Sequence, residues 1–509
     1  MNLRYSPLSV LFVSLLLSAC HGKNDYPNEN LELCYFAPLQ NKDYQLNVSI
    51  IRSCLYDLAE SDKAETGATG YTRAYYAEKK PLLWIERTGI NNRADSLVET
   101  LRHVDEMGFD ADVFRLSQIE RDLNRVRTLN FSKEHPVNKV MARLEYNLTR
   151  AYLGYTVGQR FGFVNPKYVL NRLDPIEDDT THKHFRRLFG IQMRHADESF
   201  YTKALRQISS DSLYDFLRES RPTEPLYYTL LKRLNSPDVT AEQRKALICN
   251  MERCRWNLLE RPKDYKRYVF VNIPNFCLYA IDDDKTVSMR VGCGAFKTKT
   301  PVLTSKINLI QLNPQWVIPG SIVKKDILHH VGDADYFSRH NYYVFDSKTG
   351  EHVDIEEVTR EMLMDKGYRV AQQGGQGNAL GRIVFRFPND YSVYLHHTNT
   401  PGFFSREERG VSHGCVRVEE PYALAAFLLK DKDEDFLSRV YYSMTTDLKS
   451  QDLERSKLLN SVKVSPEVPL FISYYTAYPD STGNLQFYRD VYGYDSVIYQ
   501  RLEWRLKKR

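Results

Sequence analysis

The pattern of apolar and polar residues changes near residue 262. Before that point, apolar residues recur three or four positions apart, as at Leu144, Leu148, Ala151 and Tyr155. Residues with this spacing share one face of an α-helix, and such a stripe usually faces the core of a domain. We therefore predict an all-helical domain over residues 65–262.

Beyond residue 262, short runs of β-branched and aromatic residues alternate with turn residues. Two hairpins are predicted from this pattern. The first joins Phe276–Ile281 to Thr286–Val291, and the second joins Val384–Phe387 to Tyr391–Leu395.

The end of the chain continues the β-rich pattern around one helix. Residues 421–429 begin with a proline, which is typical of the first turn of a helix, and residues 468–490 are predicted to form two closing strands. Residues 263–509 are therefore predicted to form a β-rich domain. The fold class expected for the whole chain is α+β, with the helical domain first.

The first residues are typical of a lipoprotein signal. Met1–Arg4 is short and positively charged, Leu8–Leu17 is apolar, and Leu17-Ser-Ala-Cys20 follows as a lipobox. We predict that residues 1–19 are the signal peptide, that Cys20 is acylated, and that residues 20–64 form the lipidated N-terminus and tether. A cleaved signal with a coincidental cysteine is the alternative. Acylation of Cys20 places the protein on the periplasmic side of a bacterial membrane.

Composition and charge are those of a globular body on such an anchor. Hydrophobic residues make up 42% of the chain and charged residues 27%, and the net charge of +5 is the difference between 70 basic and 65 acidic residues. This balance, without a basic stripe, argues against a nucleic-acid partner. The six cysteines other than Cys20 and Cys415 match no disulfide-rich framework. We expect a monomer.

The chemistry is concentrated around one cysteine. Cys415 follows a glycine in Gly410-Val-Ser-His-Gly-Cys-Val-Arg-Val418, and His396 stands at the predicted end of a strand, 18 intervening residues upstream. An ordinary thiol is mostly protonated at neutral pH, so a nucleophilic cysteine needs a nearby base. We predict Cys415 as the nucleophile and His396 as its general base.

The residues around Cys415 complete a site for acyl transfer. Gly414 permits a backbone conformation in which the successive N–H groups around His413, Gly414 and Cys415 point at one spot, which predicts an oxyanion hole. Arg417 lies two residues beyond Cys415, on the same face of a following strand. Its guanidinium is therefore a candidate ligand for a substrate carboxylate.

Ser412-His-Gly-Cys415-Val-Arg417, with His396 upstream, resembles the active-site signature of the L,D-transpeptidases, the YkuD-type enzymes that remodel peptidoglycan. Trp84 and the Asn250–Trp256 segment resemble the scaffold region of the larger periplasmic members. The resemblance covers most of the mature chain and also implies that residues 320–372 form a cap over the cleft.

The resemblance implies a reaction in two steps without a cofactor. Cys415 attacks the carbonyl of the third residue in a tetrapeptide stem, terminal D-alanine leaves, and an amine of a neighbouring stem resolves the thioester to a 3-3 cross-link. The backbone carbonyl of His397 orients the base in such enzymes, although its side chain departs from the smaller or acidic residue common there. We assign substrate-binding roles to these residues: Arg417, Asn378, Tyr394 and Ser412.

Four alternatives remain open from the sequence. His396, His397, His413 and Cys415 supply zinc-type ligands, but adjacent histidines on a strand face opposite ways, which argues against a metal site. Cys415 is alternatively a buried structural cysteine. An L,D-carboxypeptidase or endopeptidase uses the same residues with water as acceptor. A non-catalytic lipoprotein that binds the cell wall is the fourth possibility.

Overall fold

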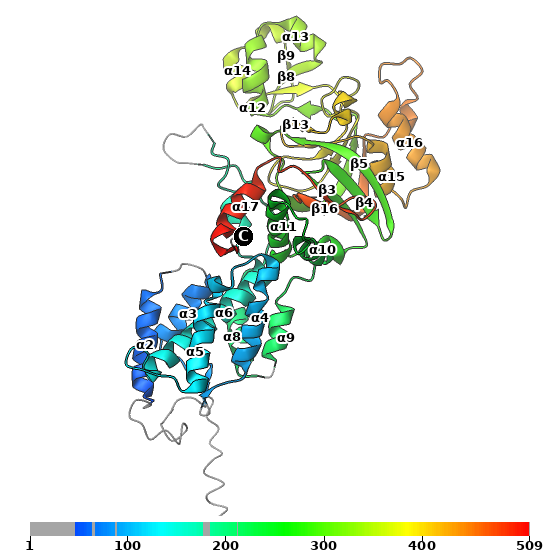
Figure 1. Ribbon diagram of the computed structural model, residues 1–509. Coiled ribbons are helices and arrows are strands. Elements are labelled where there is room, and N and C mark those ends of the chain that lie inside the picture. Colours follow the sequence, from blue (N-terminus) through cyan, green and yellow to red (C-terminus); the bar gives the residue numbers. More distant parts are fainter. Residues whose placement is uncertain (1–45, 64–66, 87–88, 177–183, 211, 508–509) are drawn as a thin grey trace, which may run out of the picture.

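The computed structural model describes residues 46–63, 67–86, 89–176, 184–210 and 212–507. A helical domain precedes a β-rich domain, as the sequence predicts, and the last helix returns to lie between them (Figure 1). The predicted signal peptide and the lipidation site at Cys20 lie outside the described residues. In the described part of the chain, no helix combines the length and the apolarity needed to cross a bilayer.

The helical domain is built around α6 (Val137–Phe161), which packs against α2, α3 and α5. The predicted stripe of Leu144, Leu148, Ala151 and Tyr155 is fully buried on this helix. The other helices are α2 (Val48–Ser61), α3 (Gly67–Ala77), α4 (Arg93–Arg102), α5 (Leu116–Thr128), α7 (Pro166–Leu170), α8 (Glu198–Ile208), α9 (Leu213–Glu219), α10 (Pro225–Leu234) and α11 (Ala241–Arg255), with a small hairpin of β1 (Ile85–Glu86) and β2 (Gly89–Ile90).

The prediction of a tether over residues 20–64 is wrong for its last part, because α2 belongs to the helical domain. The side chain of Asn47 caps this helix by accepting a hydrogen bond from the Ile50 N–H at 3.1 Å. Ile51, Leu55 and Ala59 are buried, so one face of α2 packs into the domain. This stripe is short, which is why the sequence pattern did not reveal it.

The β-rich domain is a nine-stranded sheet that closes on itself. Its order is β13-β5-β14-β12-β11-β6-β15-β3-β4, and β4 also pairs with β5. Its strands are β3 (Arg267–Asn272), β4 (Cys277–Asp282), β5 (Lys285–Gly294), β6 (Leu303–Leu312), β11 (Ile383–Arg386), β12 (Leu395–His396), β13 (Gly410–Ser412), β14 (Val416–Val418) and β15 (Ser461–Ser473). Helices α15 (Pro421–Leu428) and α16 (Glu434–Thr445) follow β14, and β16 (Ala477–Pro479) and β17 (Leu485–Phe487) form a separate hairpin.

The first predicted hairpin and the helix that starts at Pro421 are confirmed, but the second hairpin is shorter than predicted. In β11 and β12 only two residue pairs face each other, Val384 with His396 and Phe385 with Leu395. The carboxamide of Asn389 bonds to the backbone of the connecting segment, where its oxygen accepts from the N–H groups of Tyr391 and Val393. These local bonds replace the strand ladder there.

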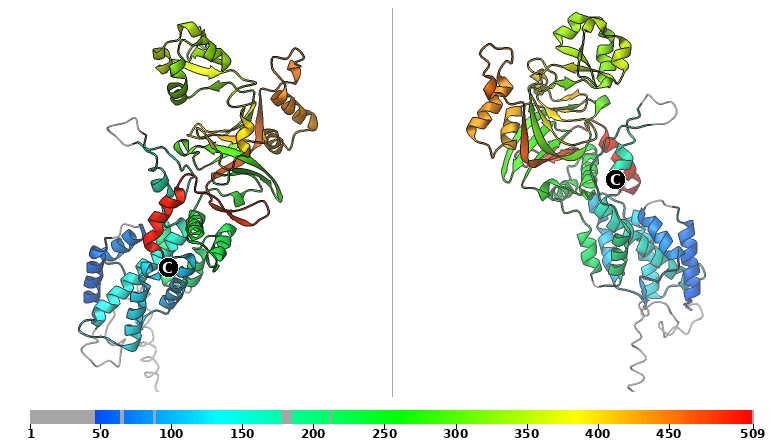
Figure 2. Two further views of the ribbon diagram at one scale, coloured as in Figure 1. Left: turned by 45° about the horizontal axis from the view of Figure 1, so that its top comes forward. Right: turned by 180° about the vertical axis from the view of Figure 1, so that it is seen from behind.

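The segment predicted as a cap forms a small subdomain that has a sheet of its own. Strands β7 (Trp316–Val317), β8 (Tyr342–Asp346), β9 (His352–Val353) and β10 (Tyr368–Gln372) make a four-stranded sheet beside α12 (Gly320–Ile322), α13 (Ala334–Arg339) and α14 (Arg360–Met364). Ile327, Phe337 and Val344 lie in its own apolar core. Two further views show it at the opposite end of the β-rich domain from the helical domain (Figure 2).

The C-terminal helix α17 (Tyr494–Leu502) joins the two domains. Arg253 of α11 forms an ion pair with Asp495 of α17 at 2.6 Å, and both side chains are about 95% buried. Asp495 also accepts a hydrogen bond from Thr476 at 2.5 Å. A buried charge is stable only when it is paired in this way, so the junction is a defined interface rather than a loose linker.

Candidate active site

Two neighbouring strands place the predicted nucleophile and base on one face of the sheet. β12 and β14 are parallel, and His396 lies opposite Arg417 while Leu395 lies opposite Val416. Side chains alternate between faces along a strand, so His396 and Arg417 share one face with the residues two positions before them, Tyr394 and Cys415. Leu395 and Val416 point the other way and are fully buried in the core.

His396 is held as a neutral imidazole. Its residue is 4% exposed, and burial, followed by the positive charge of Arg417, lowers its pKa to about 3. Backbone groups of His397 and Leu380 oppose this shift. Nδ1 nevertheless makes no well-formed hydrogen bond to any described residue, including the His397 carbonyl that the sequence analysis assigned to it. The orienting role of that carbonyl therefore stays a prediction.

Cys415 is held as a neutral thiol. The residue is partly buried, and this burial raises the pKa of its thiol to about 11, against the opposing effects of the Tyr394 backbone and of Arg417 and Arg386. Among the described residues, no hydrogen bond joins Sγ to the imidazole of His396. At neutral pH the pair is accordingly thiol and imidazole rather than thiolate and imidazolium. Catalytic hydrogen bonds often form only when substrate is bound.

The turn that carries Cys415 is fixed by Ser412. Its hydroxyl donates to the Cys415 carbonyl at 2.5 Å and accepts from the Gly414 N–H at 3.0 Å. Ser412 is buried, so the substrate contact predicted for it does not exist in this conformation. Gly414 has φ +126°, in the region that favours glycine. Since the Gly414 N–H is occupied, the N–H groups of His413 and Cys415, which have no partner in the described chain, are the free donors for an oxyanion.

A second layer of hydrogen bonds holds the turn from behind. The Thr300 hydroxyl donates to the Gly414 carbonyl at 2.8 Å and accepts from the Gly294 N–H at 2.8 Å. Tyr492 closes the network, because its hydroxyl accepts from the Thr300 N–H at 3.1 Å and donates to the Gly294 carbonyl at 2.7 Å. Neither Thr300 nor Tyr492 was predicted as part of the site, and no local signal marks Tyr492, which lies far from Cys415 along the chain.

Replacing Thr300 by valine is expected to slow acylation of Cys415 about ten- to hundred-fold, because a nucleophile displaced by even 1 Å reacts much more slowly. The measurement is the rate of thioester formation followed by intact mass. Thr300→Ser keeps the hydroxyl and should restore most of the rate. Thr304→Val is the matched control, since the Thr304 hydroxyl is buried without a partner among the described residues. Equal acylation rates for Thr300→Val and Thr304→Val would show that this hydrogen-bond network does not position Cys415.

Arg417 is an unpaired cation beside Cys415. Its Nε is buried without a hydrogen-bond partner, and no acidic residue of the described chain pairs with it. Burial lowers its pKa, and Cys415 opposes that shift. The guanidinium lies 5.7 Å from the ring centroid of Phe403. A guanidinium without a partner is suited to receive a carboxylate, as the sequence predicts.

Tyr394 shares this face with a second arginine. The ring centroids of Tyr394 and His396 are 6.1 Å apart, and the guanidinium of Arg386 stands 4.7 Å from the Tyr394 ring centroid. Burial and then Cys415 raise the pKa of Tyr394 to about 12, against Arg386 and Trp316. Tyr394 is therefore a neutral hydroxyl next to the nucleophile. Its contact with substrate remains a prediction.

Asn378 and the side chain of His397 are committed to the backbone. Asn378 is 1% exposed, its amide donates to the Gln373 carbonyl at 2.8 Å, and its oxygen accepts from the Leu380 N–H at 2.8 Å. The substrate role predicted for Asn378 therefore has no free group to perform it. Nδ1 of His397 accepts a hydrogen bond from the Arg382 N–H at 3.3 Å. This local contact gives a structural reason for a histidine where related enzymes carry a smaller or acidic residue.

Charged residues of the π-helical turn η7 (Val323–Ile327) in the cap lie within electrostatic range of the nucleophile turn. Burial and then the charge of Lys325 lower the pKa of the exposed His413, while Asp326 opposes them. These effects require the cap residues to lie near His413.

Within the described ranges, no three histidine, cysteine or acidic side chains form a group suited to a metal ion.

Comparison with known proteins agrees with this organisation. The L,D-transpeptidase catalytic domain matches residues 266–440, and the Scaffold domain matches residues 70–234. A protein of Haemophilus influenzae named "Putative L,D-transpeptidase" is 30% identical over 325 residues, which is 62% of this chain and 63% of the relative. The chain thus spans less than two thirds of that relative's length.

Two solved structures show only slight similarity. The L,D-transpeptidase from Mycobacterium smegmatis has 13% identity over 41% of this chain and 58% of its own, with a TM-score of 0.18. A cysteine-to-serine mutant of the Enterococcus faecium L,D-transpeptidase has 8% identity over 41% of this chain and 50% of its own, with a TM-score of 0.16. Such scores carry no argument about this fold. On the family matches, the chain carries a Scaffold domain followed by an L,D-transpeptidase catalytic domain of the YkuD family.

Proposed function

We propose that this protein is a peptidoglycan L,D-transpeptidase that uses Cys415 as its nucleophile. The donor is a tetrapeptide stem, the leaving group is its terminal D-alanine, and the acceptor is an amine of a neighbouring stem. One observation carries the proposal: Cys415, His396 and the unpaired Arg417 share one face of two parallel strands within the matched catalytic domain.

The neutral pair defines the order of the proton transfers. Sγ of Cys415 attacks the carbonyl carbon of the third stem residue while the imidazole of His396 accepts the thiol proton. The N–H groups of His413 and Cys415 stabilise the oxyanion. Collapse of this intermediate breaks the amide bond, and His396 returns the proton to the amine of D-alanine. The acceptor amine then attacks the thioester, which releases Cys415 and forms the cross-link.

The product of the reaction tests the proposal. The full chain is incubated with tetrapeptide muropeptides, and the products are separated and identified by mass. A dimer joined through two third-position residues is expected, with free D-alanine. Monomeric tripeptide as the sole product would identify a hydrolase on the same site. Unchanged tetrapeptide would contradict the proposal and leave only a role in binding the cell wall.

Arg417→Ala is expected to reduce kcat/KM about ten- to hundred-fold for a stem with a free carboxylate, because a hydrogen bond to a charged group contributes about 1.5–3 kcal/mol. The measurement compares that stem with the same stem whose terminal carboxylate is amidated. The parent enzyme should prefer the carboxylate, and Arg417→Ala should lose the preference. Arg417→Lys keeps the positive charge but not the two parallel N–H donors of the guanidinium. Its preference for the carboxylate should therefore lie between those of the parent and of Arg417→Ala. An unchanged preference in Arg417→Ala would place the carboxylate elsewhere.

We also propose that the protein is anchored to the periplasmic face of a bacterial membrane through acylated Cys20. The lipobox motif before Cys20 supports this location. Cys20→Ser is expected to move the protein from the membrane fraction to the soluble fraction, since one lipidated site holds the chain. The measurement is the distribution of the protein after fractionation. Retention of Cys20→Ser on the membrane at the parent level would show that another feature anchors it.

A further inference from the structure

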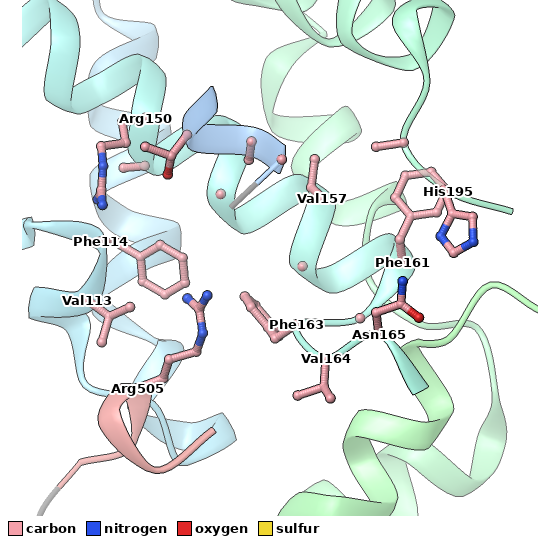
Figure 3. A pocket seen from close by; sticks show the side chains of 18 of the residues that line it. Val113, Phe114, Arg150, Val157, Phe161, Phe163, Val164, Asn165, His195 and Arg505 are labelled. Atoms are coloured by element: carbon pink, nitrogen blue, oxygen red, sulfur yellow. The ribbon is translucent and has the colours of Figure 1, made fainter. Parts of the chain in front are cut away.

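A cavity of about 580 Å³ lies in the helical domain, and no residue that lines it belongs to the strands around Cys415. It opens between α6, the turn η4 (Ala111–Phe114) and the C-terminal turn η12 (Glu503–Arg505) (Figure 3). Its volume is within the range of roughly 300–1,000 Å³ that is usual for small-molecule sites. Its walls are mainly apolar and include Phe114, Val157, Phe161 and Phe163.

One unpaired cation enters this cavity. The guanidinium of Arg505 points into the space between Phe114 and Phe163 (Figure 3). It forms no ion pair or hydrogen bond with any described residue, and its centre lies 4.0 Å from the Trp504 ring centroid and 5.3 Å from that of Phe163. Burial lowers the pKa of Arg505 to about 10, against the effect of Glu252, so the group remains cationic at neutral pH.

The surrounding charges leave an excess of positive charge. Arg150, which also lines the cavity, pairs with Asp62 at 2.9 Å, and Arg115 approaches the same carboxylate at 3.8 Å. The other carboxylate near Arg505 is that of Glu252, which is buried against Arg255 at 3.4 Å. Of these groups only Arg150 and Arg505 line the cavity, and its lining residues include no aspartate or glutamate. An anion entering the cavity therefore meets a favourable field.

We propose that this cavity binds an amphiphilic carboxylate, a single apolar chain that ends in one carboxylate group. The guanidinium of Arg505 receives the carboxylate through two parallel hydrogen bonds, and the chain lies along α6 among the aromatic walls. Gly154 leaves that stretch of α6 open, whereas the ring of Phe163 packs against Gly158. This binding site is separate from the reaction at Cys415 and does not depend on the proposed function.

Calorimetric titration of the full chain tests the proposal. Three probes share one ten-carbon chain: sodium decanoate, the neutral decanol and the cation decyltrimethylammonium. Decanoate is expected to bind one molecule per chain, at least tenfold more tightly than decanol, and the cation should bind least. Arg505→Gln should bind decanoate no better than the parent binds decanol. Arg501→Gln is the matched control, because Arg501 is an exposed arginine on the neighbouring α17.

Gly154→Leu provides a second variant that fills the cavity without disturbing the helix. A Cβ at this position meets only the Phe114 ring, at 4.0 Å, so a side chain is accepted there. Decanoate binding should be lost while the thermal unfolding temperature is unchanged or higher. The proposal is overturned if no probe binds to the parent, if all three bind equally, or if Arg505→Gln binds decanoate as the parent does. If Gly154→Leu does not fold, the comparison of decanoate binding between Arg505→Gln and the parent still tests the proposal.

Discussion

Replacing Cys415 by alanine is expected to abolish both D-alanine release and cross-link formation from tetrapeptide muropeptides. Among the described residues on the face of β12 and β14 that carries His396, Cys415 supplies the thiol, and the Tyr394 hydroxyl stays protonated because its pKa is raised to about 12, so no thioester forms in this variant. The loss should reach the detection limit, at least about four powers of ten, because removal of an enzyme's nucleophile leaves only residual catalysis. The measurement is the appearance of both products over time, separated by chromatography.

Cys277→Ala is the matched control for this prediction. Cys277 is also a free, partly buried cysteine of the β-rich domain, but it lies on β4 and has no role in the account. It should retain the parent rate. If Cys415→Ala turned over substrate at a measurable fraction of the parent rate, the nucleophile would have to be another group.

Replacing His396 by alanine is expected to slow acylation by about two to four powers of ten at neutral pH. The thiol of Cys415 has a pKa near 11, so only about one molecule in ten thousand carries a thiolate at pH 7. The parent avoids this limit because neutral His396 accepts the proton during the attack. Without the imidazole, only the pre-formed thiolate reacts. The measurement is the acylation rate of each protein under single-turnover conditions.

The pH profile separates this role from a structural one. His396 stays neutral above its pKa of about 3 and Cys415 stays protonated below about 11, so the parent rate should be nearly flat between pH 5 and 9. The thiolate fraction in His396→Ala rises with pH, so its rate should increase about tenfold per pH unit over the same interval. An acylation rate that is independent of pH in both proteins would show that His396 is not the base. A tenfold rise in the parent rate per pH unit would lead to the same conclusion.

The sequence predicted the parts of the site that depend on strand periodicity. Arg417 stands two residues after Cys415, and the alternation of side chains along β14 places both on one face. The pairing of β12 with β14 as parallel neighbours then adds His396 and Tyr394 to that face. The placement of Arg417 beside Cys415 followed from residue spacing alone, because a strand leaves little freedom in where each side chain points, whereas the pairing of β12 with β14 is known only from the structure.

The assignments that this conformation does not favour concern short polar side chains. Ser412 and Asn378 were assigned to substrate, yet both bond to the nearby backbone. Sequence alone does not distinguish these alternatives, because serine and asparagine satisfy a neighbouring N–H or carbonyl as readily as a ligand. The N–H of Gly414, predicted as an oxyanion donor, likewise donates to the Ser412 hydroxyl in this structure.

Long-range contacts were also beyond the sequence pattern. Tyr492 supports the nucleophile turn from the C-terminal segment, and α2 packs on α6 through only three buried positions. The cap strands contain two to five residues with charged neighbours, which hides their alternation. Each of these features is decided by which surfaces meet in the folded chain, and local propensity does not report that.

Whether Cys415 is a nucleophile is decided by the mass of the intact protein after exposure to a carbapenem, a reactive acyl donor for a nucleophilic cysteine. One covalent adduct per chain is expected, located at Cys415 by peptide mapping and missing from Cys415→Ala. An unmodified parent protein, or an adduct of equal yield in Cys415→Ala, would contradict this role of Cys415.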